Sequence, residues 1–550
     1  MTDLRRAWHV AAALALLALA SACARAPQAA DTHAEEASAT PVAGGTLTWG
    51  VETEPATLNP QLNGQAKVYL LLRNSYESLL ARDAQGGFVP WLASGYSVST
   101  DARSFSFTLR EDVKFSDGSA LDAATVARNF AALADPRYTA GTPHAGLVEL
   151  IERIDTPDPH TITFTLKRAY APLLGYIANV PLLAASAFDK PDIKTGGPDI
   201  AGTGPFVIKT YQPGQQIEFV RNPDYHWAPA TAVHQGPAYL ERLIYRFLPE
   251  SSVRIGALRS GQVNVIEGVP GQDAAPLRED PSLRYLEAAN TGTPYTLYFN
   301  VQRAPTDDAR IRQALVEGLD IDTLVQSIYR GQRQRAWGIT SPVDPLYDAS
   351  IEHGYGNHAE QANRLLDQAG WSARDAQGYR VRDGSRLSIA LLDTSVLLRD
   401  QRDLLLLAIQ AQARQRLGVE LRFEQLDAGS YFTRVLGGDY GILANSTVEV
   451  DGRAIDVHYL PGARGGFLNL SRAQDPQLGQ WLDAASASQD PAERRRIYGQ
   501  LQQYVILQQH LALPLYLPQD QVVAQRRVHG LGFRPLFRLP ENAYDVWIEH

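Results

Sequence analysis

Polar side chains suited to binding a ligand gather in short loops beside apolar runs. Ser446, Thr447, Glu449 and Asp451 follow the apolar run 440–444, which predicts a strand that ends in a polar loop. Oxygen atoms at a strand end can accept hydrogen bonds, and a carboxylate removed from water needs a cationic partner. These four residues are therefore candidates for ligand binding.

A second group of candidates lies closer to the N-terminus. Thr57 falls in 54–59, and Asn63 and Tyr69 bound another stretch in which Asn, Gly and Pro indicate loops with free polar groups. Tyr69 and Trp337 carry rings that can stack on a ligand, although aromatic side chains more often pack in a core. We include Thr57, Asn63, Tyr69 and Trp337 in the predicted site.

The motifs of the common enzyme classes are absent from the sequence. There is no Gly-x-Ser-x-Gly, His-Glu-x-x-His, Walker loop or Cys-x-x-Cys. Gly202-x-Gly204 is followed by Pro205, which lacks the N–H that a phosphate-binding turn needs. His353 and His358 are five residues apart and do not share a helix face. We therefore expect no catalytic residue, no cofactor and no resident metal.

The composition is that of a folded protein with a mild charge. The 550 residues are 45% hydrophobic and 20% charged, and the net charge is −9. No block of Lys and Arg supplies the electrostatic surface that nucleic acid requires. We expect a monomer that binds no nucleic acid.

The N-terminus has the features of a secretory signal peptide over residues 1–22. Arg5-Arg6 precedes an apolar core, 10–20, that is too short to span a membrane. Small residues before Cys23, the only cysteine, resemble the lipobox of bacterial lipoproteins, which implies a lipid-modified Cys23. The alternative is an ordinary secretory signal with an incidental cysteine. The Ala-, Pro- and Thr-rich stretch that ends at residue 44 predicts a flexible tether over 23–44.

Strands and helices alternate from residue 45 onward, which indicates an α/β protein with mixed sheets. The order strand 387–392, helix 404–417 and strand 419–423 favours a parallel pair with a crossover helix. We also expect helices over 69–80, 120–133 and 309–319. The last of these follows Asp307-Asp308, whose carboxylates can cap it.

Four motifs together resemble bacterial extracellular solute-binding proteins of family 5, which serve ABC importers for peptides and nickel chelates. They are 105–118 with its Lys-Phe-x-Asp-Gly turn, 202–206 with 221–225 and Trp227, 257–263, and 297–300 with 308–314 and Asp320. The resemblance implies a bilobal fold with a hinge. Lobe I would span 45–290, with 512–550 returning to it, and lobe II would span 291–511.

By the same resemblance, a short peptide is captured between the lobes and delivered to a membrane permease, with Asp451 holding the peptide ammonium. An exposed turn acid before Gly452 is the alternative role of Asp451. A nickel chelate or metallophore would instead use Arg73, Arg453 or His458. A ligand sensor without transport and an extracellular hydrolase are the other hypotheses. The expected location is the periplasm or cell envelope, as a membrane-anchored lipoprotein.

Overall fold

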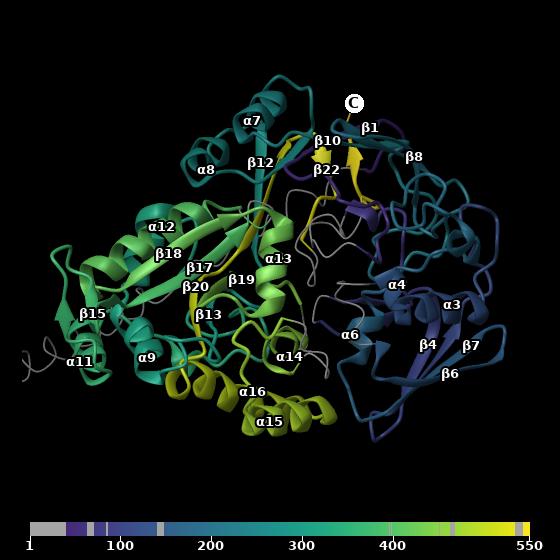
Figure 1. The fold of residues 1–550 in the computed structure, drawn as a ribbon. Helices are drawn as coiled ribbons and strands as arrows, with labels where there is room; N and C mark the ends of the chain where they lie inside the picture. Colours follow the sequence, from purple (N-terminus) through teal and green to yellow (C-terminus); the bar gives the residue numbers. More distant parts are fainter. Residues whose placement is uncertain are drawn as a thin grey trace, which may run out of the picture. The chain divides into compact units, whose positions relative to one another are not determined.

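The protein was analysed as a computed structural model (Figure 1). The structure describes residues 40–62, 71–83, 86–139, 148–394, 397, 399–449, 452–461, 468–533 and 543–549. The predicted signal peptide and Cys23 lie outside these residues. No helix in the described part of the chain is long and apolar enough to cross a membrane.

The largest sheet has seven strands and mixed direction. Its order is β12 (Leu283–Ala289), β21 (Gln519–Gln525), β11 (Val265–Glu267), β1 (Thr46–Val51), β10 (Arg242–Phe247), β9 (Gln216–Arg221) and β8 (Phe206–Gln212). The first strand, β1, runs parallel to both β10 and β11, and the other pairs are antiparallel. Strands from both ends of the chain therefore build one sheet.

The second sheet has five strands, and it carries the candidate site described below. Its order is β18 (Glu420–Leu426), β17 (Ser388–Thr394), β19 (Ile442–Asn445), β13 (Tyr295–Phe299) and β20 (Ala512–Tyr516). Helix α12 (Arg402–Gln412), prolonged by η5 (Ala413–Leu417), joins β17 to the parallel strand β18. The predicted strand–helix–strand unit is thus confirmed.

The remaining strands form an antiparallel four-stranded sheet and three smaller ones. The four strands are β4 (Ala93–Val98), β5 (Ser104–Leu109), β7 (Thr161–Leu166) and β6 (Ile151–Asp158). The smaller sheets pair β14 (Ala373–Arg374), β15 (Arg380–Arg382) and β16 (Ser385–Arg386); β2 (Leu80–Arg82) and β3 (Phe88–Pro90); and β22 (Val528–His529) and β23 (Trp547–Ile548).

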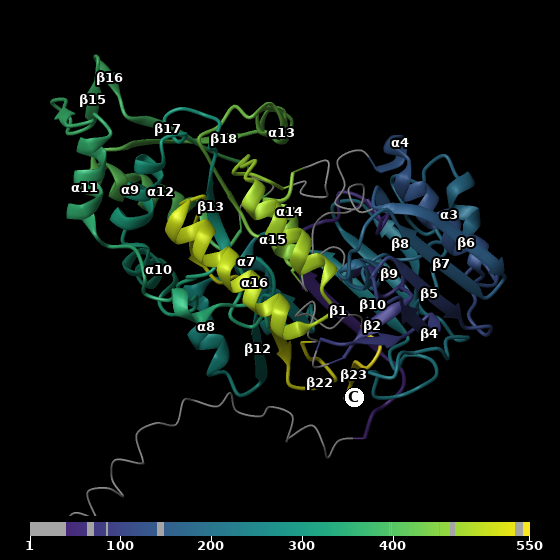
Figure 2. The ribbon, with the colours of Figure 1, turned by 90° about the horizontal axis from the view of Figure 1, so that it is seen from below.

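Helices cover these sheets. They are α3 (Ala123–Ala134), α4 (Pro136–Thr139), α6 (Leu173–Ile177), η2 (Ala185–Asp189), α7 (Ser251–Arg259), α8 (Gly271–Arg278), α9 (Ala309–Gly318), α10 (Ile321–Tyr329), η3 (Ala349–Ile351), α11 (Ala359–Gln368), α13 (Ala428–Gly437), α14 (Arg453–Tyr459), α15 (Pro476–Ala487), α16 (Pro491–Gln503) and η7 (Tyr504–Gln508). In Figure 2, which shows the molecule from below, α15 and α16 lie in front of the five-stranded sheet.

Two predicted helices begin with aspartate caps, and the cap at Asp308 was itself predicted. The Asp122 carboxylate accepts a hydrogen bond from the Thr125 N–H (2.7 Å) at α3, and Asp308 accepts one from the Arg310 N–H (2.9 Å) at α9. The expected helix over 69–80 is wrong in its described part, where Leu71 and Leu72 end a helical turn and β2 follows. The backbone there bonds elsewhere, because Ser75 O accepts the Gly204 N–H at 2.9 Å.

The seven-stranded sheet contributes to one hydrophobic core, the first core, and the five-stranded sheet to another, the second core. The chain passes between the two sheets twice, at 290–294 (the first crossing) and at 517–518 (the second crossing). β12 pairs with β21 in the larger sheet, and β13 pairs with β20 in the five-stranded sheet. Between these pairs, the Asn290 N–H donates to Pro518 O (2.8 Å). Segments 290–294 and 517–518 therefore run side by side from one sheet to the other.

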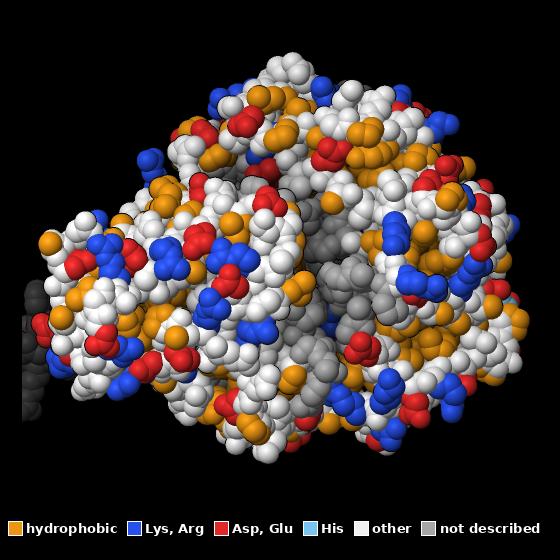
Figure 3. Space-filling view, in the orientation of Figure 1, with side chains coloured by type: hydrophobic (Ala, Val, Ile, Leu, Met, Phe, Trp, Pro, Cys, Tyr) orange, Lys and Arg blue, Asp and Glu red, His pale blue; other side chains and the backbone are white. Residues whose placement is uncertain are grey.

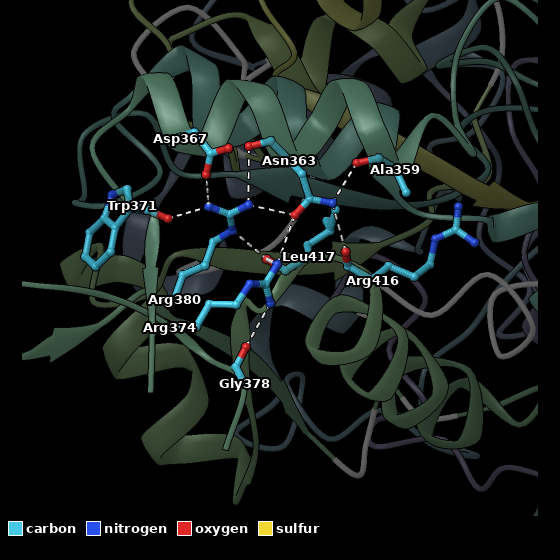
Figure 4. A network of polar contacts seen from close by, with 9 residues as sticks. All are labelled: Ala359, Asn363, Asp367, Trp371, Arg374, Gly378, Arg380, Arg416 and Leu417. Carbon is cyan, nitrogen blue, oxygen red and sulfur yellow. Dashed lines mark hydrogen bonds and ion pairs between the residues drawn. The ribbon is translucent and has the colours of Figure 1, made fainter. Parts of the chain in front are cut away.

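A network of polar contacts around the buried Arg380 fastens the end of the α12–η5 run (Figure 4). The Arg380 guanidinium donates to Leu417 O (2.8 Å), to Asp367 Oδ1 (2.6 Å) and to the amide oxygen of Asn363 (2.7 Å). The Asn363 amide in turn donates to Arg416 O (3.0 Å). One arginine thus ties α11, η5 and β15 together.

Candidate ligand-binding site

Several strands of the five-stranded sheet bring polar residues to one edge. Parallel strands β17 and β19 both end there, and Thr296 of β13 pairs with Asn445 at the end of β19. The register also places Tyr295 opposite Tyr516, the last residue of β20. In α/β sheets, ligands bind outside the carboxyl ends of the parallel strands. This edge is therefore the natural place to look for a site.

Two arginines at this edge share a single neutral acceptor. The Ser446 hydroxyl accepts hydrogen bonds from Arg402 Nη2 (2.7 Å) and from Arg399 Nη2 (3.2 Å). Arg402 is only 2% exposed, and the positive charge of Arg402 is the main cause that lowers the pKa of Arg399. Among the described residues, no carboxylate forms an ion pair with either guanidinium. Two close cations of this kind call for an anion.

The buried guanidinium of Arg402 is held in place by tyrosines. Its Nε donates to the Tyr516 hydroxyl (3.0 Å), and its Cζ lies 4.0 Å from the centroid of the Tyr295 ring. The Tyr516 hydroxyl donates to Asp400 Oδ2 (3.2 Å), and Arg333 Nη2 donates to Asp400 Oδ1 (3.3 Å). The position of Arg402 is therefore fixed before any ligand binds, which lowers the entropic cost of recognition.

The other polar residues at this edge come from the end of β17. Asp393 is 2% exposed, and its Oδ1 accepts the Thr394 N–H at 2.7 Å. Burial raises the pKa of the Asp393 carboxyl to about 6, against the opposing effects of that hydrogen bond and of Arg402. A carboxylate and two guanidinium groups thus lie in one region of low solvent exposure.

The segment after β19 packs tightly on the first crossing. Gly292 has φ +86°, and a Cβ there would lie 2.1 Å from Thr447 O, so only glycine fits. The Thr293 hydroxyl accepts the Thr447 N–H (2.8 Å), and Thr447 Oγ1 lies 2.9 Å from His458 Nε2. Burial lowers the pKa of His458 to about 3, so its imidazole is neutral.

Further along, α14 makes contacts with the segment around α6. Glu449 Oε1 accepts from Arg453 Nε (3.3 Å), and the Arg453 Cζ lies 5.6 Å from the centroid of the Tyr176 ring. The Tyr170 hydroxyl donates to Asp456 Oδ2 at 3.0 Å. Burial raises the pKa of the Asp456 carboxyl to about 6. These contacts therefore link Tyr170 and Tyr176, which belong to the first core, to α14, which packs in the second core.

The structure brings three predicted site residues, Ser446, Thr447 and Glu449, to one segment beside the first crossing. Asn63, Tyr69 and Asp451 lie outside the described residues. The Thr57 hydroxyl donates a hydrogen bond to Lys194 O (2.6 Å). Trp337 is partly buried in the second core, where it contacts Arg335 and Tyr355.

Of the residues proposed for a chelate ligand, Arg453 and His458 both lie on α14, where they contact Glu449 and Thr447. Arg73 is 2% exposed, donates to the Ser78 hydroxyl (2.6 Å) and lies over the Trp91 ring. Among the described residues, no group of three or more His, Cys, Asp or Glu side chains is arranged to hold a metal ion. Acidic and basic side chains are interspersed over the face shown in Figure 3.

Sequence reasoning missed Arg399, Arg402 and Asp393. A usable signal was present, because Arg402 is the first residue of α12, where the helix dipole disfavours a cation. Asp393 likewise directly follows the apolar run 387–392.

A separate pocket of about 650 Å³ lies away from this edge. Its lining comes from β4, β5 and the loops around them, and includes Arg110, Asp112 and His160. The Arg110 guanidinium is paired with Asp112 at 2.7 Å. Neither arginine of the pair contributes to the lining of this pocket.

Comparisons with known proteins agree with the motifs. The protein is 26% identical to the nickel-binding periplasmic protein of Escherichia coli over 471 residues, which cover 82% of this chain and 85% of that protein. It is 27% identical to the probable di/tripeptide-binding protein 5 of Pseudomonas aeruginosa over 479 residues, with 82% and 86% covered.

A solved structure confirms the predicted bilobal α/β fold with mixed sheets. The structure of the PBP AgaA from A. tumefaciens in complex with agropinic acid matches with a TM-score of 0.77 and 25% identity, over 92% of this chain and 99% of that chain. The family model for bacterial extracellular solute-binding proteins, family 5 middle, matches residues 87–457. The chain therefore belongs to the bacterial extracellular solute-binding proteins of family 5.

Proposed function

We propose that this protein is the extracytoplasmic substrate-binding component of an ABC importer, which captures a short peptide and delivers it to a membrane permease. Its family and a relative named for di/tripeptides support this role. The observation that carries the proposal is the pair of guanidinium groups, of Arg399 and the buried Arg402, that share Ser446. No bond is made or broken, so the protein is a carrier and not an enzyme.

A free peptide supplies the anion that this pair lacks. Its terminal carboxylate can accept hydrogen bonds from Arg399 and Arg402 at once, and such charge-assisted bonds contribute about 1.5–3 kcal/mol each. The carboxylate would also relieve the repulsion between the two cations. Recognition through a terminal group leaves the peptide side chains free to vary, because water-filled space can accommodate them.

Binding would shift an equilibrium between open and closed forms. We place lobe I on the seven-stranded sheet and lobe II on the five-stranded sheet, with the hinge at 290–294 and 517–518. The second crossing is set at 517–518 instead of 511–512 because β20 pairs with β13 in the five-stranded sheet. Contacts such as Tyr170 with Asp456 then join the two lobes. The closed monomer is the form that docks on the permease.

A nickel chelate or another small chelate is the second candidate ligand. One comparison is compatible with it, since one relative is named for nickel. An anionic chelate would bind the same two arginines through its carboxylates. A sensor that signals to a partner without transport would use the same site and differ only in the protein it contacts.

We further propose that the protein is a lipoprotein anchored in the cell envelope through Cys23. Protein expressed from the full-length sequence is expected to enter the detergent phase in a phase-partition assay, because the lipid on Cys23 supplies an apolar anchor. Cys23→Ala should move the protein to the aqueous phase. Thr32→Ala, a change in the predicted tether, serves as the control. Equal partition of all three forms would show that the cysteine is incidental.

The nature of the ligand is tested by native mass spectrometry of the full chain, purified gently in mild detergent. A set of bound masses that fits short peptides is the expected result. A single mass with a metal isotope pattern would favour the chelate. If no bound mass is found, alanine peptides are screened by melting temperature, where ligand at 100 times Kd adds about 2.7 kcal/mol of stability. Failure of both peptides and chelates to stabilise the protein contradicts the proposal.

A further inference from the structure

In addition to the two crossings, polar contacts join the first core to the second core at α14 and α15. The Tyr170 hydroxyl donates to Asp456 Oδ2 (3.0 Å), and the Ala171 N–H donates to Ser486 O (2.7 Å). Tyr170 belongs to the first core, whereas α14 and α15 pack in the second core. Figure 1 shows α6, which follows Tyr170, beside α14. Polar contacts of this kind are typical of interfaces between domains that move relative to each other.

The contacts at the margin of this interface are open to solvent. Arg168 and Asp483 form an ion pair at 3.6 Å, and their side chains are 29% and 46% exposed. The exposed Gln489 amide donates to Ser99 O at 3.0 Å. Exposed pairs are screened by water and contribute little to stability. The buried bond between Tyr170 and Asp456 is therefore the polar contact on which the interface depends most.

Asp456 is incompletely satisfied in this buried position. It is 1% exposed, and the Ser486 hydroxyl also donates to its Oδ2 (3.3 Å), whereas its Oδ1 has no hydrogen-bond partner among the described residues. A buried carboxylate with an unpaired oxygen is costly to ionise. The ionisable side chains around it are Arg168 and Tyr170 before α6, Arg453 and His458 on α14, Asp483 on α15 and Arg494 on α16. Burial outweighs the three arginines and raises the pKa of the carboxyl to about 6.

We propose that Tyr170 and Asp456 form a pH-sensitive latch between the lobes, which sets the stability of the closed form and through it the affinity for ligand. The inference rests on the proposed function in taking lobe closure as the step that retains the ligand. When the lobes separate, water reaches Asp456 and its pKa returns toward 3.8. The closed form thus holds the proton more tightly, so closure weakens as the pH rises between 3.8 and about 6. At neutral pH the ionised acid limits the lifetime of the closed form, which suits a carrier that must release its ligand.

The Ala171 N–H reports on the latch, because its acceptor, Ser486 O, lies across the interface. Its hydrogen exchange is followed by mass spectrometry on the full chain without added ligand, at pH 5 and pH 7, and is corrected for the intrinsic rate at each pH. Wild type should lose about ten-fold of its protection between these values. Asp456→Asn should keep its protection constant within about two-fold and be better protected than wild type at pH 7. A variant that is less protected than wild type at both values would show that Asp456 only supports the fold, and would overturn the inference.

Tyr170→Phe tests the other half of the latch. Loss of the hydroxyl removes a donor to a buried carboxylate, so exchange at Ala171 should be about ten-fold faster than in wild type at pH 7. Peptides from the sheet β4–β5–β7–β6 should exchange as in wild type, which shows that the lobe itself is intact. Tyr504→Phe is the matched control, because the Tyr504 hydroxyl donates to Asp475 Oδ2 (2.7 Å) within lobe II and should leave Ala171 unaffected. Unchanged exchange at Ala171 in Tyr170→Phe would overturn the latch.

The link to ligand affinity is measured by calorimetry with alanine peptides of two to four residues at the same two pH values. Wild type should bind about ten-fold more tightly at pH 5 than at pH 7, and Asp456→Asn should bind equally at both within about two-fold. A pH dependence that persists in Asp456→Asn overturns the latch while the peptide function stands. If no peptide binds, the peptide function fails, and the exchange at Ala171 alone supports or overturns the latch.

Discussion

Arg402→Met is expected to weaken binding of the ligand carboxylate by about 100-fold, or ~3 kcal/mol, because it removes a buried charge that donates to the anion. Methionine retains most of the side-chain volume, and the Tyr516 hydroxyl keeps its bond to Asp400 (3.2 Å). The ligand-free protein should therefore fold normally. Calorimetry with alanine peptides and with their C-terminal amides measures the effect.

The comparison between acid and amide isolates the role of the charge. Wild type should prefer the free acid strongly, and Arg402→Met should bind both forms with similar weak affinity. Arg422→Met, on the neighbouring strand β18 with a side chain 50% exposed, is the control and should bind as wild type does. An Arg402→Met protein that still discriminates acid from amide would contradict the assignment of the anion site.

The arginine pair is also connected to the crossings between the sheets. Tyr516 and Asp400 join Arg402 to Arg333, as described above. With the amide of Gln521 oriented by its neighbours, its oxygen accepts from Arg333 Nη1 (2.9 Å) and from the Tyr285 hydroxyl (3.0 Å). Gln521 belongs to β21 and Tyr285 to β12, which are strands of the larger sheet. A ligand that displaces the guanidinium of Arg402 would thus act on contacts beside the hinge.

Local patterns in the sequence predicted much of the fold correctly. The segments 387–392 and 419–423 became the parallel strands β17 and β18. Aliphatic side chains on both faces suit the buried β17, whereas alternating apolar and charged residues suit the half-exposed edge strand β18. Asp308 capped the helix that it was expected to cap, and the helix predicted over 120–133 formed as α3. These features depend on neighbours within a few residues, which is the range that a single sequence reports.

The parts that sequence reasoning missed depend on contacts between distant segments. The helix expected over 69–80 was wrong because Asn74 and Ser75 bond to Gly204 and Phe206, more distant in the chain than any helical partner. The arginine pair was missed for the same reason, since Ser446 meets Arg399 and Arg402 only through the pairing of β17 with β19. Ser446 itself was predicted because it directly follows a strand.

The largest expected effect on stability comes from Arg380. The Arg380 side chain is buried, and its N–H groups donate hydrogen bonds to Leu417 O, Trp371 O and the Asn363 amide oxygen (Figure 4). Asp367, its ion-pair partner, is 51% exposed and can return to water when the pair is lost. The cost of Arg380→Ala therefore arises mainly from the buried carbonyl oxygens that lose their donor, at about 1–3 kcal/mol for each unsatisfied group.

We expect Arg380→Ala to destabilise the region around η5 by about 3 kcal/mol, which is a ~100-fold loss of amide protection. Hydrogen exchange followed by mass spectrometry resolves this region, and peptides from η5 and β18 should exchange faster while those from the seven-stranded sheet are unchanged. Arg364→Ala, an exposed residue on α11, should stay within about 0.5 kcal/mol of wild type. Leu417 ends the α12–η5 run that begins at Arg402, so a more mobile η5 should also weaken ligand binding. Unchanged hydrogen exchange in η5 would contradict this prediction, and would show that Asn363 and Arg374 suffice to hold η5 in place.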